Sequence, residues 1–313
     1  MADVKKIATR EAYGNALCAL APKYDFVVLD ADLAAATKTG IFKKQYPERF
    51  FDCGIAEGNM MSVAAGIAST GKPVFASSFA MFASGRAFEQ VRNSIGYPGL
   101  NVKIGATHGG ISVGEDGATH QCNEDFATMR SIPGMVIINP CDGVEATAAV
   151  EAALLHQGPV YMRFGRYALP IINGEDYKFE LGKGVLMADG TDVTLVGTGF
   201  MVSICLEARD LLAKEGISAR VINIHTIKPI DKDILIKAAK ETGALVTAEE
   251  HTIMGGLGSA VAEVLVENHP APMARVGVED TFGRSGTVPA LMEHYGLTAE
   301  NIAAKAKEVI KRK

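Results

Sequence analysis

Short apolar runs that favour β-strands alternate with longer helical stretches along this chain of 313 residues, and that alternation constrains the fold more than any other feature. In the first half, the expected strands cover residues 26–29, 73–76, 101–106, 136–139 and 160–163. The expected helices there cover residues 6–21, 57–69, 80–96 and 143–156. Strands that alternate with helices predict βαβ units, and therefore an α/β fold whose mainly parallel sheets carry helices on both faces.

The alternation is interrupted where residues 173–176 and 188–191 have the composition of turns. We therefore predict two α/β domains, residues 1–172 and 191–313, joined by a linker over residues 173–190. In the second domain, strands are expected over residues 193–196, 219–224, 244–248 and 274–278, and helices over residues 201–215, 231–242, 257–267, 287–295 and 299–312.

The composition excludes several classes of function. The formal net charge is −5 and the chain has no stripe of lysine or arginine, so no broad surface for nucleic acid is expected. No apolar run approaches the ~20 residues of a membrane span, and the first residues lack the apolar core of a signal peptide. The five cysteines have neither zinc nor Cys-x-x-Cys spacing, so we expect no metal site on this chain. These features predict a cytoplasmic protein with reduced thiols and no membrane partner.

Ligands of open α/β sheets lie at the carboxyl ends of the strands, so the loops after strands are the candidate sites. Asp30 and Asp32 follow the strand at 26–29, where they would either bind a ligand or cap a helix. Glu57 begins the helix expected at 57–69, among small and apolar neighbours that predict its partial burial. Burial raises the pKa of a carboxyl group and a helix N-terminus lowers it, so such a group suits proton exchange with a bound base. A carboxylate that only stabilises its helix is the alternative.

The loop over residues 107–121 has the strongest functional signal. It follows the strand at 101–106 and holds four glycines, two histidines, one aspartate and one glutamate. Loops of this length and content are usually functional. Its Ser112 lies in a Gly-x-Ser-x-Gly pattern, but the strand ends about six residues earlier, whereas a nucleophile elbow turns directly from strand to helix. A serine hydrolase is therefore a remote alternative. The glycine-rich residues 255–258 lack a full dinucleotide motif, since Val261 occupies its last position.

Several segments together resemble the transketolase family, in the family's order and from about residue 6 onward. The similar segments are residues 51–60 around the cofactor-activating glutamate, 77–90 in the aromatic wall, 114–121 in the sugar-binding loop, 164–166 with the phosphate-binding arginine, and 226–231 in the C-terminal domain. The resemblance implies a pyrimidine-binding domain followed by a transketolase C-terminal domain. It also implies thiamine diphosphate as cofactor and transfer of a two-carbon ketol unit from a ketose phosphate to an aldose phosphate.

The resemblance assigns roles to individual residues. Glu57 would share a proton with the pyrimidine ring of the cofactor, Phe79 and Phe82 would pack on that ring, and Asp32 would lie near it. His120, with Asp116, would bond the hydroxyls of the sugar and assist proton transfer at its carbonyl group. The expected clamp for the sugar phosphate consists of Arg10, His108 and Arg166, with Thr37 or Lys38 as additional candidates. Arg10 would otherwise be a surface salt-bridge partner.

One departure from the family pattern is informative. The family's diphosphate-binding domain carries a Gly-Asp-Gly segment that holds Mg²⁺, and no Gly-Asp-Gly occurs in this sequence. The chain therefore resembles the C-terminal subunit of a split transketolase. A separate N-terminal subunit would hold Mg²⁺ (or Ca²⁺) and the diphosphate, and this chain would pair with itself within a heterotetramer. Related alternatives are 1-deoxyxylulose-5-phosphate synthase, the β subunit of a 2-oxo acid dehydrogenase, and a non-catalytic scaffold subunit.

Overall fold

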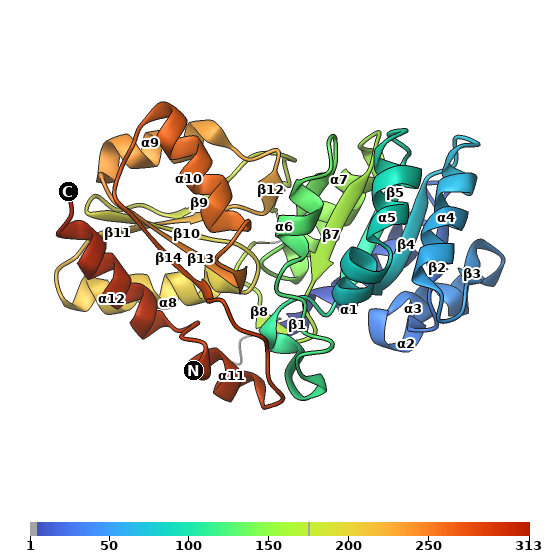
Figure 1. The fold of residues 1–313 in the computed structure, drawn as a ribbon, viewed down its shortest axis with the longest axis horizontal. Helices are drawn as coiled ribbons and strands as arrows, with labels where there is room; N and C mark the ends of the chain where they lie inside the picture. Colours follow the sequence, from blue (N-terminus) through green and yellow to red (C-terminus); the bar gives the residue numbers. More distant parts are fainter. Residues whose placement is uncertain (1–4, 175) are drawn as a thin grey trace.

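Two sheets with their helices lie side by side in the computed structural model, which describes residues 5–174 and 176–313 (Figure 1). Glu175, in the turn expected at residues 173–176, lies outside the described residues. The elements up to residue 170 are β1 Lys6–Ala8, α1 Thr9–Leu20, β2 Val27–Asp30, α2 Ala34–Thr37, α3 Thr39–Gln45, β3 Phe50–Asp52, α4 Glu57–Ala68, β4 Val74–Phe79, α5 Phe88–Gln90, β5 Val102–Thr107, α6 Asp125–Arg130, β6 Val136–Ile138, α7 Gly143–Leu155, β7 Val160–Phe164 and β8 Ala168–Pro170. The later elements are β9 Val185–Ala188, β10 Val193–Gly197, α8 Met201–Lys214, β11 Ala219–Asn223, β12 Thr226–Lys228, α9 Lys232–Thr242, β13 Leu245–Thr252, α10 Leu257–Asn268, β14 Met273–Val278, α11 Val288–His294 and α12 Ala299–Ile310.

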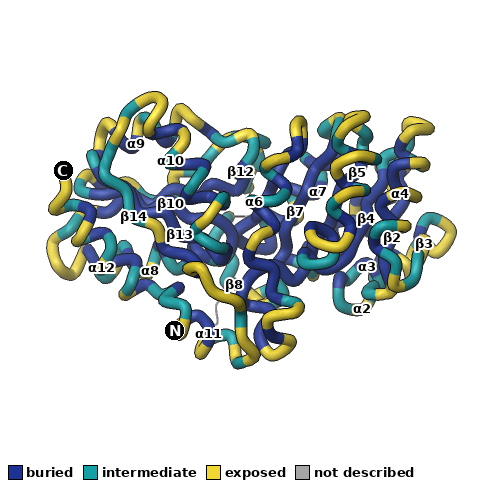
Figure 2. Tube along the Cα trace, viewed as in Figure 1, coloured by how far each residue is buried: buried dark blue, intermediate teal, exposed yellow. Residues whose placement is uncertain are grey.

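The first sheet has seven strands in the order β12-β6-β7-β5-β4-β2-β3. Its strands run parallel except β12, which pairs antiparallel with β6. Strands β2, β4, β5 and β7 are buried along their whole length (Figure 2). Helices α1 and α7 cover one face and α4 covers the other, which explains why these strands are almost continuously apolar.

The second sheet has five strands in the order β14-β13-β10-β11-β9, of which only β9 is antiparallel to its neighbour. Helices α8 and α12 pack on one face of this sheet and α9 and α10 on the other. The predicted fold class, two α/β domains with mainly parallel sheets, is confirmed.

Several segments differ from the sequence prediction. Residues 6–8 do not begin a helix but form β1, which pairs antiparallel with β8. The long helix expected over residues 80–96 contains two π-helical turns, Phe82–Arg86 and Val91–Gly96. Strand β9 lies inside the segment expected to be a linker, and β12 adds an edge strand to the first sheet although it follows β11 in the chain.

Candidate active site

The carboxyl ends of β2, β4, β5 and β7 meet at one edge of the first sheet because these strands are parallel neighbours. The loops and helices that follow these strands carry the predicted site residues. Phe79 ends β4, His108 follows β5, and Arg166 follows β7. Arg10 reaches the same edge from α1, because its Nη1 bonds to His108.

Glu57 is the first residue of α4, and only 1 % of its side chain is exposed. Arg86 Nη1 donates to both carboxylate oxygens, Oε1 at 3.2 Å and Oε2 at 3.0 Å. The same guanidinium lies over the ring of Phe82, 4.8 Å from its centroid. The π-turn over Phe82–Arg86 brings these groups together, since π-turns shift the phase of a helix and are frequent at functional sites. Sequence reasoning gave Arg86 no role.

The aromatic residues form one continuous cluster with both histidines of the long loop. The rings of Phe79 and Phe82 are nearly parallel, at 13°, with their centroids 5.8 Å apart. His108 stacks on Phe79 at 3.8 Å, and His120 meets the edges of Phe79 and Phe82 at 6.1 and 5.5 Å. Four side chains that the sequence analysis predicted for the site are therefore in contact.

His108 is a neutral hydrogen-bond acceptor. Burial, followed by the charges of Arg10 and Arg166, lowers its pKa to about 3. Because arginine only donates, the 3.0 Å contact between Arg10 Nη1 and His108 Nε2 makes Nε2 the acceptor. The proton is then on Nδ1, which donates to Thr107 Oγ1 at 2.9 Å. Arg10 also donates to the carbonyl of Ala36 at 2.8 Å, so it has a fixed place within the site.

Arg166 faces the acidic end of the loop. Its Nη1 lies 3.4 Å from Glu115 Oε2 and 3.7 Å from Asp116 Oδ1, and it donates to the carbonyl of Val113. Burial and then the neighbouring Arg166 lower the pKa of Arg10. Two guanidinium groups close enough to repel each other, beside a neutral histidine, offer hydrogen-bond donors to an anion, which would compete with Glu115 and Asp116 for Arg166.

Asp30, the last residue of β2, and Asp32, two residues later, differ in burial and in hydrogen bonding. Asp30 is buried and caps the following turn, since it accepts from the backbone N–H of Leu33 at 2.7 Å and from the hydroxyls of Thr37 and Thr39 at 2.7 and 2.8 Å. Burial raises its pKa to about 6. Asp32 is exposed at the rim of the same edge, with a φ of 61°. Thr37 is committed to Asp30, and Lys38 lies between α2 and α3 in the left-handed conformation.

The two glycine patterns have structural explanations. Ser112 is buried in a 3-10 turn over Ile111–Asp116, so it does not sit on a strand-to-helix elbow. Gly256 lets the start of α10 approach the buried carboxylate of Glu249, which accepts from the N–H groups of Leu257 and Gly258 at 2.6 and 2.8 Å, and Gly258 lets α10 approach Thr247 and Arg275. Burial raises the pKa of Glu249 to about 7.

Within the described residues, no group of three or more histidine, cysteine, aspartate or glutamate side chains is arranged to hold a metal ion. None of the helices in that part of the chain is both long and apolar enough to cross a membrane.

The fold and the site define a two-domain α/β protein with a buried glutamate, an aromatic cluster and two neighbouring arginines at one sheet edge. The family model "Transketolase, pyrimidine binding domain" matches residues 5–171, and "Transketolase, C-terminal domain" matches residues 182–302. The chain belongs to the transketolase family.

Relatives of about the same length support the assignment to this family. The chain is 50 % identical to a putative transketolase C-terminal section of Methanocaldococcus jannaschii, over 97 % of this chain and 96 % of the relative. It is 47 % identical to a 6-deoxy-6-sulfo-D-fructose transketolase subunit of Clostridium sp., over 97 % and 95 %. A solved structure described as "Split gene transketolase, inactive beta4 tetramer" is 52 % identical, with a TM-score of 0.92 over 97 % of this chain and 99 % of that one. The resemblance to the C-terminal subunit of a split transketolase is confirmed.

Proposed function

We propose that this chain is the C-terminal subunit of a split transketolase, which transfers a two-carbon ketol unit from a ketose phosphate to an aldose phosphate. The observation that carries the proposal is one continuous group of side chains at a single sheet edge. A buried carboxylate at Glu57, the aromatic pair Phe79 and Phe82, and the cationic residues Arg10 and Arg166 all belong to that group.

These residues fit one end of thiamine diphosphate. Phe79 and Phe82 form a nearly parallel aromatic pair against which an aminopyrimidine ring would pack, and Glu57 is a carboxylate that can share a proton with a ring nitrogen. No comparable group of described residues fits the diphosphate end of the cofactor. The sequence has no Gly-Asp-Gly, and the described residues contain no metal-binding cluster. An N-terminal subunit would therefore bind the diphosphate and its Mg²⁺ or Ca²⁺, which agrees with relatives named as sections or subunits.

When bound, the cofactor supplies the carbanion chemistry, and the protein supplies orientation and electrostatics. Glu57 holds a proton at the pyrimidine ring, and Asp32 contributes a polar group at the rim of that site. Asp116 and His120 bond the hydroxyls of the donor sugar, and His120 moves a proton at its carbonyl oxygen. Arg10 and Arg166 bind the terminal anion. His108 positions Arg10, because its Nε2 accepts from that guanidinium.

The nature of the terminal anion defines the substrate class. A phosphate is the first expectation, because paired arginines suit its oxygens. The relative named for 6-deoxy-6-sulfo-D-fructose presents a sulfonate as the second candidate. Reconstituting this chain with the N-terminal subunit and assaying xylulose 5-phosphate, 6-deoxy-6-sulfofructose and pyruvate distinguishes these donors. Turnover of pyruvate alone would favour the synthase or 2-oxo acid dehydrogenase alternatives.

The decisive test combines subunit dependence with Glu57. We expect ketol transfer only when both subunits, Mg²⁺ and thiamine diphosphate are present, and none with Glu57→Ala. Circular dichroism and the melting temperature of the variant should stay close to those of the wild-type chain. Activity of this chain alone would refute the split arrangement, and an active Glu57→Ala complex would refute the role of Glu57.

The proposal also covers the assembly of the subunits and their location in the cell. The related split-gene transketolase is described as an inactive beta4 tetramer, which supports self-pairing of this chain within a heterotetramer. Native mass spectrometry of the mixture should show two copies of each subunit. The cysteines are all free thiols, which supports a cytoplasmic location.

A further inference from the structure

We infer that the second α/β domain positions the substrate loop, so that Ile111, Gln121 and Glu250 determine where Asp116 and His120 stand. The substrate loop is defined as residues 108–121. It lies between the two domains, and Figure 1 shows the segment that joins β14 to α11 beside it. Four sets of contacts connect this loop or its exit to the second domain, and they come from its core, from β13 and from the segment between β14 and α11.

The first contact is apolar. Ile111 is completely buried, and it belongs to the core cluster of the second domain rather than to either cluster of the first. Met201 from α8 and Leu291 from α11 are members of the same cluster. A loop residue inserted into the core of another domain cannot move unless that core opens, because protein interiors are close-packed.

The second contact involves Glu250 on β13. Its carboxylate accepts from the backbone N–H of Ser112, and a Cβ atom at Gly110 would overlap its side chain. Arg163 on β7 joins the same group, since its Nη1 donates to the carbonyl of Glu250 at 2.9 Å and its Nη2 to that of Cys122 at 2.8 Å. One guanidinium thus links β13 to Cys122, the residue that follows the substrate loop.

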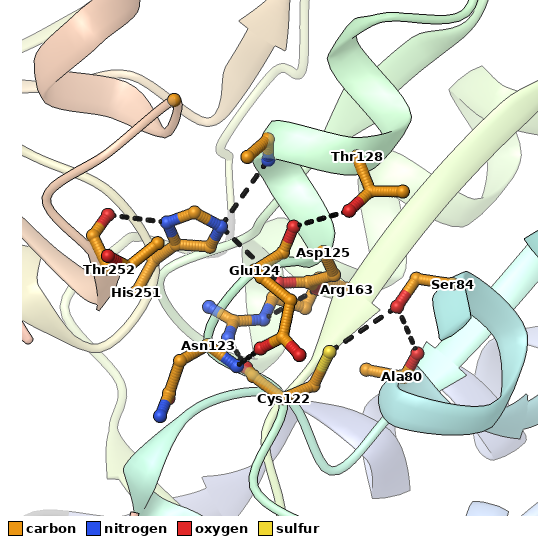
Figure 3. Close-up of polar contacts among 12 residues, drawn as sticks. Ala80, Ser84, Cys122, Asn123, Glu124, Asp125, Thr128, Arg163, His251 and Thr252 are labelled. Atoms are coloured by element: carbon orange, nitrogen blue, oxygen red, sulfur yellow. Dashed lines mark hydrogen bonds and ion pairs between the residues drawn. The ribbon is translucent and has the colours of Figure 1, made fainter. Parts of the chain in front are cut away.

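Figure 3 shows how the chain leaves the loop at this junction. The N–H of Thr252, at the end of β13, donates to the carbonyl of Asn123 at 2.7 Å. Arg163 Nε lies 3.1 Å from Asp125 Oδ2, and the ring of His251 stacks on Phe126 at 4.9 Å. The exit of the loop is therefore fixed to β13 by a backbone hydrogen bond and an aromatic contact, while the Arg163–Asp125 ion pair fixes it to β7 of its own domain.

The fourth contact is made by Gln121, of which only 3 % is exposed. Its Nε2 donates to the carbonyls of Ile111 at 3.3 Å and Gly114 at 3.1 Å, both in the substrate loop, and to that of Arg284 at 2.8 Å. Arg284 lies between β14 and α11. A Cβ at Gly283 would overlap Gln121 Oε1, so the second domain approaches this amide closely.

The contacts to the second domain hold both sides of the loop, whereas most of its tip is exposed. Glu115, Asp116 and Thr119 are exposed, while Ile111 and Gln121 on either side are buried. Fixing the two sides reduces the conformations open to the tip, and a functional group needs such support to stay within about 0.5 Å of its productive position. Ile111, Gln121 and Glu250 are accordingly positioning residues, while Asp116 and His120 would touch the substrate.

Hydrogen exchange of the purified chain tests the positioning independently of any activity. Gln121→Met keeps the size of the side chain and removes its donor, and Gly283→Ala acts from the second domain by crowding Gln121. We expect exchange of the amides of residues 111–120 to become about tenfold faster in both variants, through local opening. Gln157→Met, on an exposed turn far from the loop, is the matched control and should exchange like the wild type. Wild-type exchange in both Gln121→Met and Gly283→Ala would overturn the inference.

The kinetic arm rests on the proposed function. In the reconstituted complex, Gln121→Met should raise the KM for the sugar donor about tenfold while the affinity for thiamine diphosphate stays unchanged. Adding Gly283→Ala to Gln121→Ala should raise the KM for the sugar donor little further, because the shortened side chain at residue 121 leaves room for the new methyl group. A purely structural role would lower the melting temperature and leave KM unchanged, which would overturn the inference. If no complex turns over sugar but the exchange results hold, only the proposed function fails.

Discussion

Arg86 Nη1 donates to both carboxylate oxygens of Glu57, at 3.2 and 3.0 Å, across the start of α4. The pair is asymmetric, because 54 % of the Arg86 side chain is exposed while 1 % of the Glu57 side chain is. The carboxylate thus depends on Arg86 for its ionic partner, and the guanidinium is held in place by the ring of Phe82.

Arg86→Met should destabilise the chain, because it leaves a buried carboxylate without its partner. The expected loss is about 1–2 kcal/mol, reduced by the exposure of Arg86 to water. Urea unfolding of the purified chain measures this loss. The double variant Arg86→Met/Glu57→Gln should recover most of it, since neither charge then remains. Arg92→Met, on the exposed side of the next turn, is the control and should change stability little. Equal losses in Arg86→Met and Arg92→Met would contradict the role given to the ion pair.

Arg10→Gln should weaken binding of the donor's terminal anion. We expect the KM for a phosphorylated ketose to rise about 10–100-fold, with a smaller change in kcat, because a charge-assisted hydrogen bond of about 1.5–3 kcal/mol is lost. A ketose without the anion should show no such change in KM. Steady-state kinetics of the complex provide the measurement, with Arg209→Gln on the exposed face of α8 as the control. A similar rise in KM with both donors would show that Arg10 does not act on the anion.

The buried His108 should make the chain less stable in acid. Its pKa falls from the ordinary 6.5 to about 3 on folding, so between those values the unfolded chain binds the extra proton. Stability from this group is complete above pH 6.5 and is lost as the pH falls toward 3. Between pH 7 and pH 5 the wild type should lose about 2 kcal/mol more than His108→Gln. Urea unfolding at the two pH values checks this, and parallel losses in both proteins would contradict the assignment.

Gly256→Ala should destabilise the second domain by about 1–3 kcal/mol, because a methyl group there overlaps Glu249 Oε2. The same oxygen accepts from the backbone N–H of Leu257 at the start of α10. The φ of Gly256 is −85°, so backbone strain does not contribute. Gly66→Ala, at an exposed position of α4 with open space around it, should be neutral or stabilising. Thermal unfolding compares the two. If Gly256→Ala were neutral, the close approach of α10 to Glu249 would be in error.

The local elements were predictable because each has a local cause. Strand β4 is a short apolar run before the helical region, and α4 begins with Glu57 after a glycine-containing turn. The grouping of Phe79 with His108 follows from the parallel order of β4 and β5, which places both at one sheet edge.

The remaining features depend on residues far apart in the sequence or on a small change in the helical repeat. The π-turn at Phe82–Arg86 has the same composition as an α-helix, so the pairing of Arg86 with Glu57 was invisible in the pattern. The contact of Glu250 with Ser112 joins residues that lie 138 positions apart. Strand β12 has only three residues, and its place beside β6 is set by tertiary pairing.

Strand β12 has a practical consequence for anyone who rebuilds this protein from parts. Thr226 and Lys228 complete the edge of the first sheet, and Lys228 Nζ bonds the carbonyls of Arg130 and Ile132 at 2.8 and 2.6 Å. A chimera that exchanges everything after residue 190 would graft a foreign strand onto β6. A fragment that stops there would leave that edge bare and ready to pair with another molecule. Successful chimeras will therefore keep residues 226–228 matched to the N-terminal half, whichever homologue supplies the rest.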